Sequence, residues 1–219
     1  MEKHNSSKQS ILTRLRKAGA QALPTHPASY SQWHSDCENE RVERFQLKLT
    51  ANHAEVINVK SETIQAALEK IYQSHNIHRL AVGTNGAFHQ SIIQAGKQRE
   101  VQLFDTEIEH VKSELFNEVD AGITHSLAGI ADTGTLVLWP SVSEPRTLSL
   151  VPPIHIALIK QSTIVSNFTQ LMQTQQWHRN MPTNSLLISG PSKTADIQQT
   201  LAYGAHGPSK LIIVLIENR

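Results

Sequence analysis

The chain has a single cysteine, Cys37, among its 219 residues, and this excludes two kinds of structure. A disulfide framework needs pairs of cysteines, and an iron–sulfur cluster needs several cysteine ligands, so this chain alone forms neither. Cys37 lies in the polar segment "QWHSDCENER". We interpret it as an incidental free thiol, with a nucleophile as the alternative.

The sequence also lacks an excess of charge and a long apolar run. Its 20 Lys and Arg residues balance 19 Asp and Glu residues, which gives no electrostatic case for binding nucleic acid or an anionic membrane. No run of about 18 apolar residues is present, and the polar N-terminus lacks the apolar region of a signal peptide. We therefore expect a cytoplasmic protein without a transmembrane segment.

The twelve histidines do not form a metal-binding pattern. His75 and His78 lie three residues apart, without an acidic or cysteine residue nearby in the sequence. Zinc sites combine a close pair of ligands on a regular element with further ligands. We expect no metal site.

The order of apolar and polar segments predicts the domain organisation. Residues 10–17 form a short amphipathic helix, and a loop rich in Pro, His and Ser follows. We expect residues 1–38 to be an N-terminal arm and residues 39–219 a single α/β domain. Within that domain, short apolar strands alternate with helical segments, which favours βαβ units. The predicted fold is a three-layer α/β sandwich around a mostly parallel sheet.

The segment "LLISGPSKTADIQQTLAYGAHGPSKLIIVLIEN" holds two candidate ligand loops. The first, "SGPSKTADI", is predicted to join a buried strand to a helix that ends at Gly204. A helix N-terminus attracts anions, and Ser192, Lys193 and Thr194 would add hydroxyls and positive charge. Ordinary helix capping is the alternative. We expect these loops at the carboxyl ends of parallel strands, where ligands bind in open α/β sheets.

The second loop, "GAHGP", leads into the last strand. Gly204 and Gly207 allow a positive φ or a close approach of the backbone. His206 lies between them, and an imidazole can donate to an anion or shuttle a proton near neutral pH. The alternative is a loop histidine that hydrogen-bonds only to the backbone.

A third candidate turn lies in "GIADTGTLVLW", immediately before an apolar strand. The residues Asp132 to Thr135 bring hydroxyls, a carboxylate and backbone amides together, as a phosphate or carboxylate cradle would. An Asx-turn bonded to itself is the alternative. Further along, Arg146 is a candidate fork for a carboxylate, or else a surface ion pair with Glu144.

Together these stretches resemble a known family. "GIADTGTLVL", "RTLSLVPPIHIALI" and "ISGPSKTADIQQTLAYGAHGPSKLIIVLIEN" are similar to the LUD (lactate-utilisation) domain family, in particular to its lactate utilization protein C group. The similarity is specific from about Val119 onward and looser before it. Lys193 stands where the family commonly has Arg, which keeps the charge but loses a bidentate fork.

The resemblance implies both a fold and a role. The fold would be similar to the group that includes ribose-phosphate isomerase, glucosamine-phosphate isomerase and the CoA transferases. The role would be in oxidising L-lactate to pyruvate, alongside partner proteins that carry iron–sulfur clusters. We expect no cofactor on this chain itself, and the single cysteine fits that division of labour.

The resemblance also implies a site that binds a small anion such as lactate, pyruvate or phosphate. The residues carried over as acid or base candidates are His206 and Asp132. Those carried over as ligand-binding candidates are Thr133, Gly134, Thr135, Arg146, Gly190, Ser192, Lys193, Thr194, Gly204 and Gly207.

Two other functions remain open from the sequence. One is a stand-alone enzyme acting on a sugar phosphate or a CoA thioester, as related folds do, with Glu144 as the possible carboxylate. The other is a regulatory or assembly module without chemistry, whose contacts would lie on the N-terminal arm. One fold hosts many functions, so fold alone does not choose among them.

Overall fold

The structure is a computed structural model with two separate units. It describes residues 3–18, 31–104, 113, 115–195, 201–203 and 206–217. The smaller unit, Met1–Gln32, contains helix α1 (Lys3–Ala18), and the larger is Trp33–Arg219. The boundary thus lies earlier than the expected end of the arm at residue 38. None of the helices in the described ranges has the length and apolar character needed to cross a membrane.

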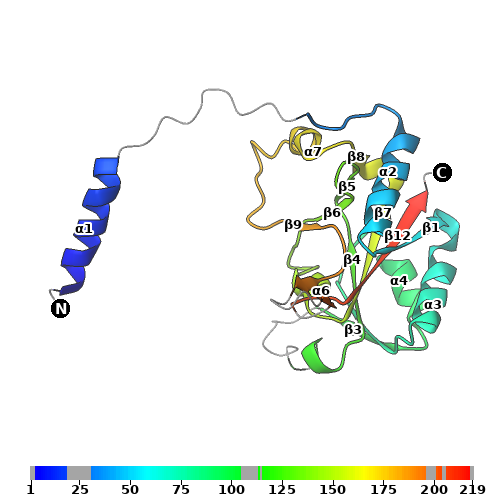
Figure 1. The fold of residues 1–219 in the computed structure, drawn as a ribbon. Coiled ribbons are helices and arrows are strands. Elements are labelled where there is room, and N and C mark those ends of the chain that lie inside the picture. The colour runs from blue at the N-terminus through cyan, green and yellow to red at the C-terminus, as the bar shows by residue number, and fades with distance from the viewer. Residues whose placement is uncertain are drawn as a thin grey trace. The chain divides into compact units, whose positions relative to one another are not determined.

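A sheet of six parallel strands is the centre of the larger unit (Figure 1). Each strand pairs in parallel with its neighbours, as expected for successive βαβ units. In spatial order the strands are β1 (Glu55–Lys60), β12 (Lys210–Glu217), β7 (Ile154–Lys160), β4 (Ala121–His125), β2 (Arg79–Val82) and β3 (Glu100–Leu103).

Both faces of this sheet are buried. Alternate residues of β7 and β12 pack on one face against α3 (Ile64–Ser74) and α4 (His89–Ala95). The residues between them pack on the other face against α2 (Glu38–Ala51), as Figure 1 shows. Burial on both faces explains the continuous apolar runs "IHIALIK" and "KLIIVLIE". The prediction of an α/β sandwich around a mostly parallel sheet is confirmed.

A second, four-stranded sheet covers part of the α2 side. Its antiparallel pairs join β5 to β6 and β6 to β9, and β8 pairs in parallel with β5. Further elements are the helices α6 and α7 and two 3₁₀ turns, of which the first contacts α3 and the second contacts α2. The bounds are β5 (Ala128–Ile130), β6 (Thr135–Leu138), α6 (Thr147–Leu150), β8 (Ile164–Val165), α7 (Phe168–Thr174) and β9 (Leu186–Ile188), with turns at Ser61–Thr63 and Gln161–Thr163.

One predicted element is wrong. The segment after "SGPS" was expected to form a helix, but β10 (Lys193–Ala195) and β11 (Leu201–Tyr203) form an antiparallel hairpin. Pairing between Lys193 and Tyr203 supplies the backbone hydrogen bonds that a helix would otherwise have made. No helix N-terminus therefore stands at Lys193 or Thr194, and the anion site proposed on that basis lacks its main element.

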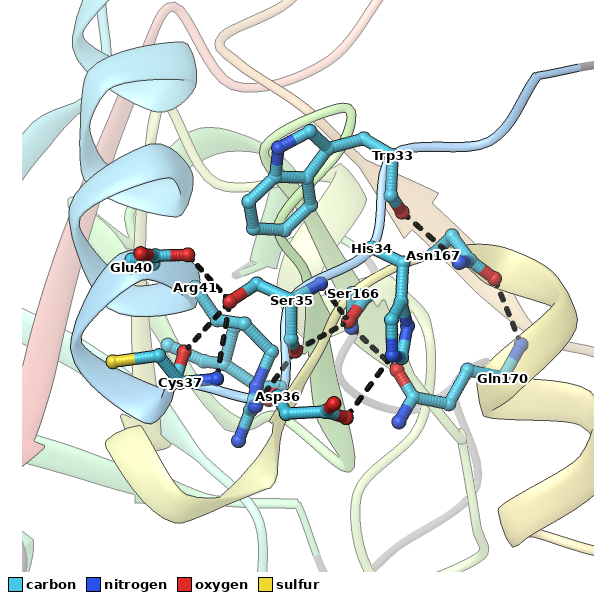
Figure 2. Close-up of polar contacts among 11 residues, drawn as sticks. Trp33, His34, Ser35, Asp36, Cys37, Glu40, Arg41, Ser166, Asn167 and Gln170 are labelled. Atoms are coloured by element: carbon cyan, nitrogen blue, oxygen red, sulfur yellow. Dashed lines mark hydrogen bonds and ion pairs between the residues drawn. The ribbon is translucent and has the colours of Figure 1, made fainter.

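The first residues of the larger unit are fastened to β8 and α7 through polar contacts (Figure 2). Ser166, which is fully buried, accepts a hydrogen bond from the Ser35 amide and donates one to the Ser35 carbonyl. Asn167 donates to the Trp33 carbonyl and also caps α7. Arg41 adds bonds to the carbonyls of Ser35 and Ile164. These bonds provide partners for the backbone N–H and C=O groups of a segment that belongs to no strand.

We predict that Ser166→Ala destabilises the larger unit by about 1–3 kcal/mol, because the Ser35 amide would be left buried without a partner, while its carbonyl keeps the bond from Arg41. Urea denaturation monitored by tryptophan fluorescence measures this change. The control is Ser162→Ala, at an exposed position on the neighbouring 3₁₀ turn. Equal stability of the two variants would contradict the prediction.

Candidate functional site

A pocket of about 250 Å³ lies at the amino ends of β7 and β12, and we call it the amino-edge pocket. Four parts of the chain form it: α6, the start of β7, the segment after β9 and the segment before β12. The lining residues are Ser149, Leu150, His155, Leu187, Ile188, Ser189, Gly190, Pro191, Ser192, His206, Gly207, Pro208 and Leu211.

Two of the predicted ligand loops meet in this pocket. The Ser192 amide donates a 2.8 Å hydrogen bond to the Pro208 carbonyl, which joins the "GPS" and "HGP" loops. Gly207 lies against Ser192, where a Cβ would make only an ordinary van der Waals contact at 3.4 Å. The exposed His206 and the half-buried Ser192 therefore line one cavity, as the predicted anion site requires.

The place of this pocket in the sheet differs from the expectation. Residues 206–208 precede β12, and His155 is the second residue of β7, so the pocket lies at the amino edge of the parallel sheet. Residues 189–192 follow β9, which belongs to the second sheet. The expectation of loops at the carboxyl ends of parallel strands was wrong because it treated all strands as members of one sheet.

His155 forms the inner wall of the amino-edge pocket. It is 1% exposed, and its Nε2 lies 2.8 Å from the Thr124 hydroxyl. Its Nδ1 has no hydrogen-bond partner among the described residues. Burial lowers the pKa of His155 from 6.5 to about 3, because the imidazolium would lose its hydration. The ring is therefore neutral at pH 7, with one nitrogen available beside a polar cavity.

The "DTGT" turn reaches the pocket only indirectly. The Thr133 and Thr135 hydroxyls lie 2.6 Å apart, and Thr135 lies 2.7 Å from the hydroxyl of Ser189. This hydroxyl chain ends at a residue that lines the pocket, whereas Thr133 and Thr135 themselves lie outside the lining. Their contribution in this structure is to hold Ser189 in position.

Asp132 and Gly134 fasten the same turn to α2. Arg44 donates a 3.0 Å hydrogen bond to the Asp132 carboxylate, and each side chain is about 30% exposed. Gly134 has φ 63°, and a Cβ there would overlap the Lys48 Cβ and approach the Leu49 amide. The turn therefore packs directly on the helix backbone, and neither residue lies in the amino-edge pocket.

The other predicted ligand residues are spread more widely. Gly190 lines the pocket, and a Cβ on it would lie 2.7 Å from the Asn52 carbonyl. Arg146 is exposed at the start of α6, and Lys193 is exposed in β10, outside the pocket lining. Of Thr194 only the backbone, in β10, is described. Gly204 lies outside the described residues.

Sequence reasoning gave no role to two histidines that the structure places at strand ends. His155 is the second residue of β7, inside the run "IHIALIK", where a polar residue in a buried strand was a usable signal. His125 ends β4, and its Nδ1 lies 2.7 Å from the Glu144 carboxylate. Glu144 is therefore paired with His125 rather than with Arg146. Within the described ranges, no three His, Cys, Asp or Glu residues gather as metal ligands would.

Comparison with known proteins identifies the family. The profile of the LUD domain matches residues 42–216, which is most of the chain. The chain belongs to the LUD domain family. The match begins inside α2 and ends in β12, so it includes the central sheet, the second sheet and both motif loops of the amino-edge pocket.

Several proteins are similar to this LUD protein over most of its length. An uncharacterised protein of Neisseria meningitidis serogroup B is 36% identical, over 96% of this chain and 94% of the relative. Lactate utilization protein C of Halalkalibacterium halodurans is 30% identical, over 78% of this chain and 76% of the relative. The protein of that name from Anoxybacillus flavithermus is 28% identical, over 83% of each chain.

A solved structure has the same fold. It is a DUF162 family protein from Deinococcus radiodurans, which superposes with a TM-score of 0.63 and 21% identity. The match covers 83% of this LUD chain and 99% of the other. At this identity, the comparison supports the architecture of the sheet and not a shared activity.

The neutral His155 predicts a specific acid sensitivity. Because the unfolded chain takes up a proton near pH 6.5 and the folded ring does not, stability falls as the pH drops from about 6.5 toward 3. Between pH 7 and 5 this single group costs about 2 kcal/mol. We predict that, between pH 7 and pH 5, His155→Gln loses about 2 kcal/mol less stability than the unmodified chain does.

Urea denaturation at pH 7 and pH 5 measures the difference, with His178→Gln as the control at an exposed histidine. The comparison uses the change with pH within each variant, so any loss of stability of His155→Gln at pH 7 cancels. If all three proteins lose the same stability on acidification, the assignment of a neutral, buried His155 is wrong.

Proposed function

We propose that this LUD protein is a subunit of a system for lactate utilisation, and that it binds a small anion in the amino-edge pocket. In this proposal the reaction served is the oxidation of L-lactate to pyruvate, and iron–sulfur proteins act as partners. The names of the relatives support the lactate role, because proteins called lactate utilization protein C align with most of the chain.

The observation that carries the choice of pocket is the meeting of two motif loops over a buried imidazole. Residues 189–192 and 206–208 are separated in sequence by the β10–β11 hairpin, yet a backbone hydrogen bond joins them. Ser192 offers a hydroxyl, and His206 offers a solvent-exposed imidazole. His155 closes the inner end with an unpartnered nitrogen. Such convergence of a few polar groups in one concave site is typical of small-ligand pockets.

The chemistry of the ligand follows from these groups. A carboxylate accepts hydrogen bonds, and the Ser192 hydroxyl and an imidazole N–H of His206 are donors. Lactate oxidation releases two electrons and two protons. Because His206 is exposed to solvent and imidazole is the commonest general base, we assign it the transfer of the hydroxyl proton, and we assign the two electrons and the second proton to the partner proteins.

The first test is thermal unfolding of the purified chain with L-lactate, pyruvate, phosphate, a sugar phosphate or CoA. A ligand at 100 times its Kd stabilises the folded state by about 2.7 kcal/mol, which is a readable shift in Tm. We expect L-lactate or pyruvate to give this shift. Ser192→Ala and His206→Ala should each reduce the shift, whereas His178→Ala should keep it.

The outcomes separate the competing functions. Stabilisation by a sugar phosphate or CoA alone would favour a stand-alone enzyme and count against a lactate site. An equal shift in Tm in all variants would show that the ligand binds outside the amino-edge pocket. If none of the ligands changes the Tm, this would contradict ligand binding by the isolated subunit.

The second test addresses His206 in the assembled system. We predict that His206→Ala lowers lactate oxidation by the complex of the chain with its partners by 10²-fold or more, the usual contribution of a positioned acid or base. The variant should unfold at the same urea concentration as the unmodified chain, because His206 is exposed. Unchanged oxidation by His206→Ala would remove this residue from the mechanism.

A further inference from the structure

A second cavity lies at the other end of the parallel sheet. It has a volume of about 500 Å³ and is lined by residues 85–87, 125–127, 139, 141, 143 and 144. These segments follow β2, β4 and β6, and we call the cavity the carboxyl-edge pocket. It shares no lining residue with the amino-edge pocket. The crevice beyond the carboxyl ends of parallel strands is where open α/β sheets usually bind ligands.

A histidine–carboxylate pair forms one wall of this pocket. Glu144 accepts two hydrogen bonds from His125, one from Nδ1 at 2.7 Å and one from the backbone amide at 2.8 Å. Each side chain is 17% exposed. The carboxylate thus holds the imidazole at two points, which fixes the position of the ring in the cavity wall.

A backbone amide determines the tautomer of His125. The Phe88 amide lies 3.2 Å from Nε2, and an amide can only donate, so Nε2 carries no proton. The proton therefore sits on Nδ1 and is donated to Glu144. The one lone pair of Nε2 accepts from the Phe88 amide, so a ligand hydroxyl bonds to Nε2 only by replacing that amide as the donor.

The loop after β2 is built to lie against this pair. Gly86 has φ 145°, and a Cβ on it would overlap the His125 ring. The Thr84 amide donates a 2.8 Å bond to the Ser143 carbonyl, which locks this loop to the one that carries Glu144. A Cβ on Gly83 would lie 2.5 Å from that same carbonyl. The pocket is therefore held in shape before any ligand arrives.

The charges of the lining select the ligand class. The residues in this lining include no lysine or arginine, and Glu144 carries the only carboxylate. Ser126 lines the pocket with a hydroxyl that has no partner among the described residues. Ser141 and Ser143 line it too, with hydroxyls that lie 3.0 Å apart. An anion would meet a carboxylate without a counter-charge, whereas a neutral hydroxyl can both donate to Nε2 and accept from the serines.

We propose that the carboxyl-edge pocket binds a small uncharged ligand that bears several hydroxyl groups. One hydroxyl donates to Nε2 of His125 in place of the long bond from the Phe88 amide, and the Ser126 hydroxyl takes a second one. This site differs from the amino-edge pocket in position and in ligand charge, so either can fail without the other.

The test is a side-chain ¹⁵N NMR titration of the full chain, with the His125 signal assigned from His125→Gln. D-ribose is the uncharged probe, and phosphate and pyruvate at equal concentration are the anionic probes. We expect ribose to shift the His125 Nε2 signal in a saturable manner, and the anions to leave it unchanged. No saturable shift with ribose, or a shift with the anions alone, would overturn the proposal.

Two variants sharpen the result. Glu144→Gln should weaken ribose binding about tenfold, because the amide no longer fixes the imidazole. Glu43→Gln, on the exposed side of α2, is the matched control and should bind as the unmodified chain does. If Glu144→Gln does not fold, Ser126→Ala serves instead, since it leaves no protein group unpaired. Unweakened binding in a folded Glu144→Gln or in Ser126→Ala would also overturn the proposal.

Discussion

The parallel pairing of β7 with β4 on one side and β12 on the other is the constraint on which the rest of the molecule depends. A strand in that position has both faces covered, so its middle must be apolar. Ile156 to Ile159 are all buried within 1% exposure. Polar chemistry is thereby excluded from the centre of the sheet and confined to its two edges, where the amino-edge and carboxyl-edge pockets lie.

β4 connects those two edges through adjacent residues. Thr124 bonds to His155 in the wall of the amino-edge pocket, while His125 bonds to Glu144 in the carboxyl-edge pocket. Successive side chains of a strand point to opposite faces, so one short strand serves both sites. His155 pairs in register with Gly122 and His125 with Leu158, a separation of about 10 Å along the strands.

Much of the fold was predictable because its strands are apolar on both faces and its helices keep a regular period. α2, α3, β7 and β12 follow from such local patterns. The β10–β11 hairpin does not, because "SKTADIQQTLAY" has neither a strict strand alternation nor a strong helical face, and the pairing of Lys193 with Tyr203 spans the segment. The second sheet was missed because its strands are short and its β6–β9 pair joins segments far apart in the chain.

The candidate site shows that a sequence motif alone does not tell which of its residues line the pocket. The loops at 189–192 and 206–208 do meet, as their resemblance to one family implied. Residues of the "DTGT" turn are equally specific to the family, but they contact α2 instead of the pocket. Asp132 is paired with Arg44, 88 residues away, and Gly134 lies on the backbone of α2. In this structure the Asp132 carboxylate forms an ion pair with α2 and does not line the amino-edge pocket. A motif residue thus serves either the ligand or the packing, and only its partners, which are distant in sequence, decide which.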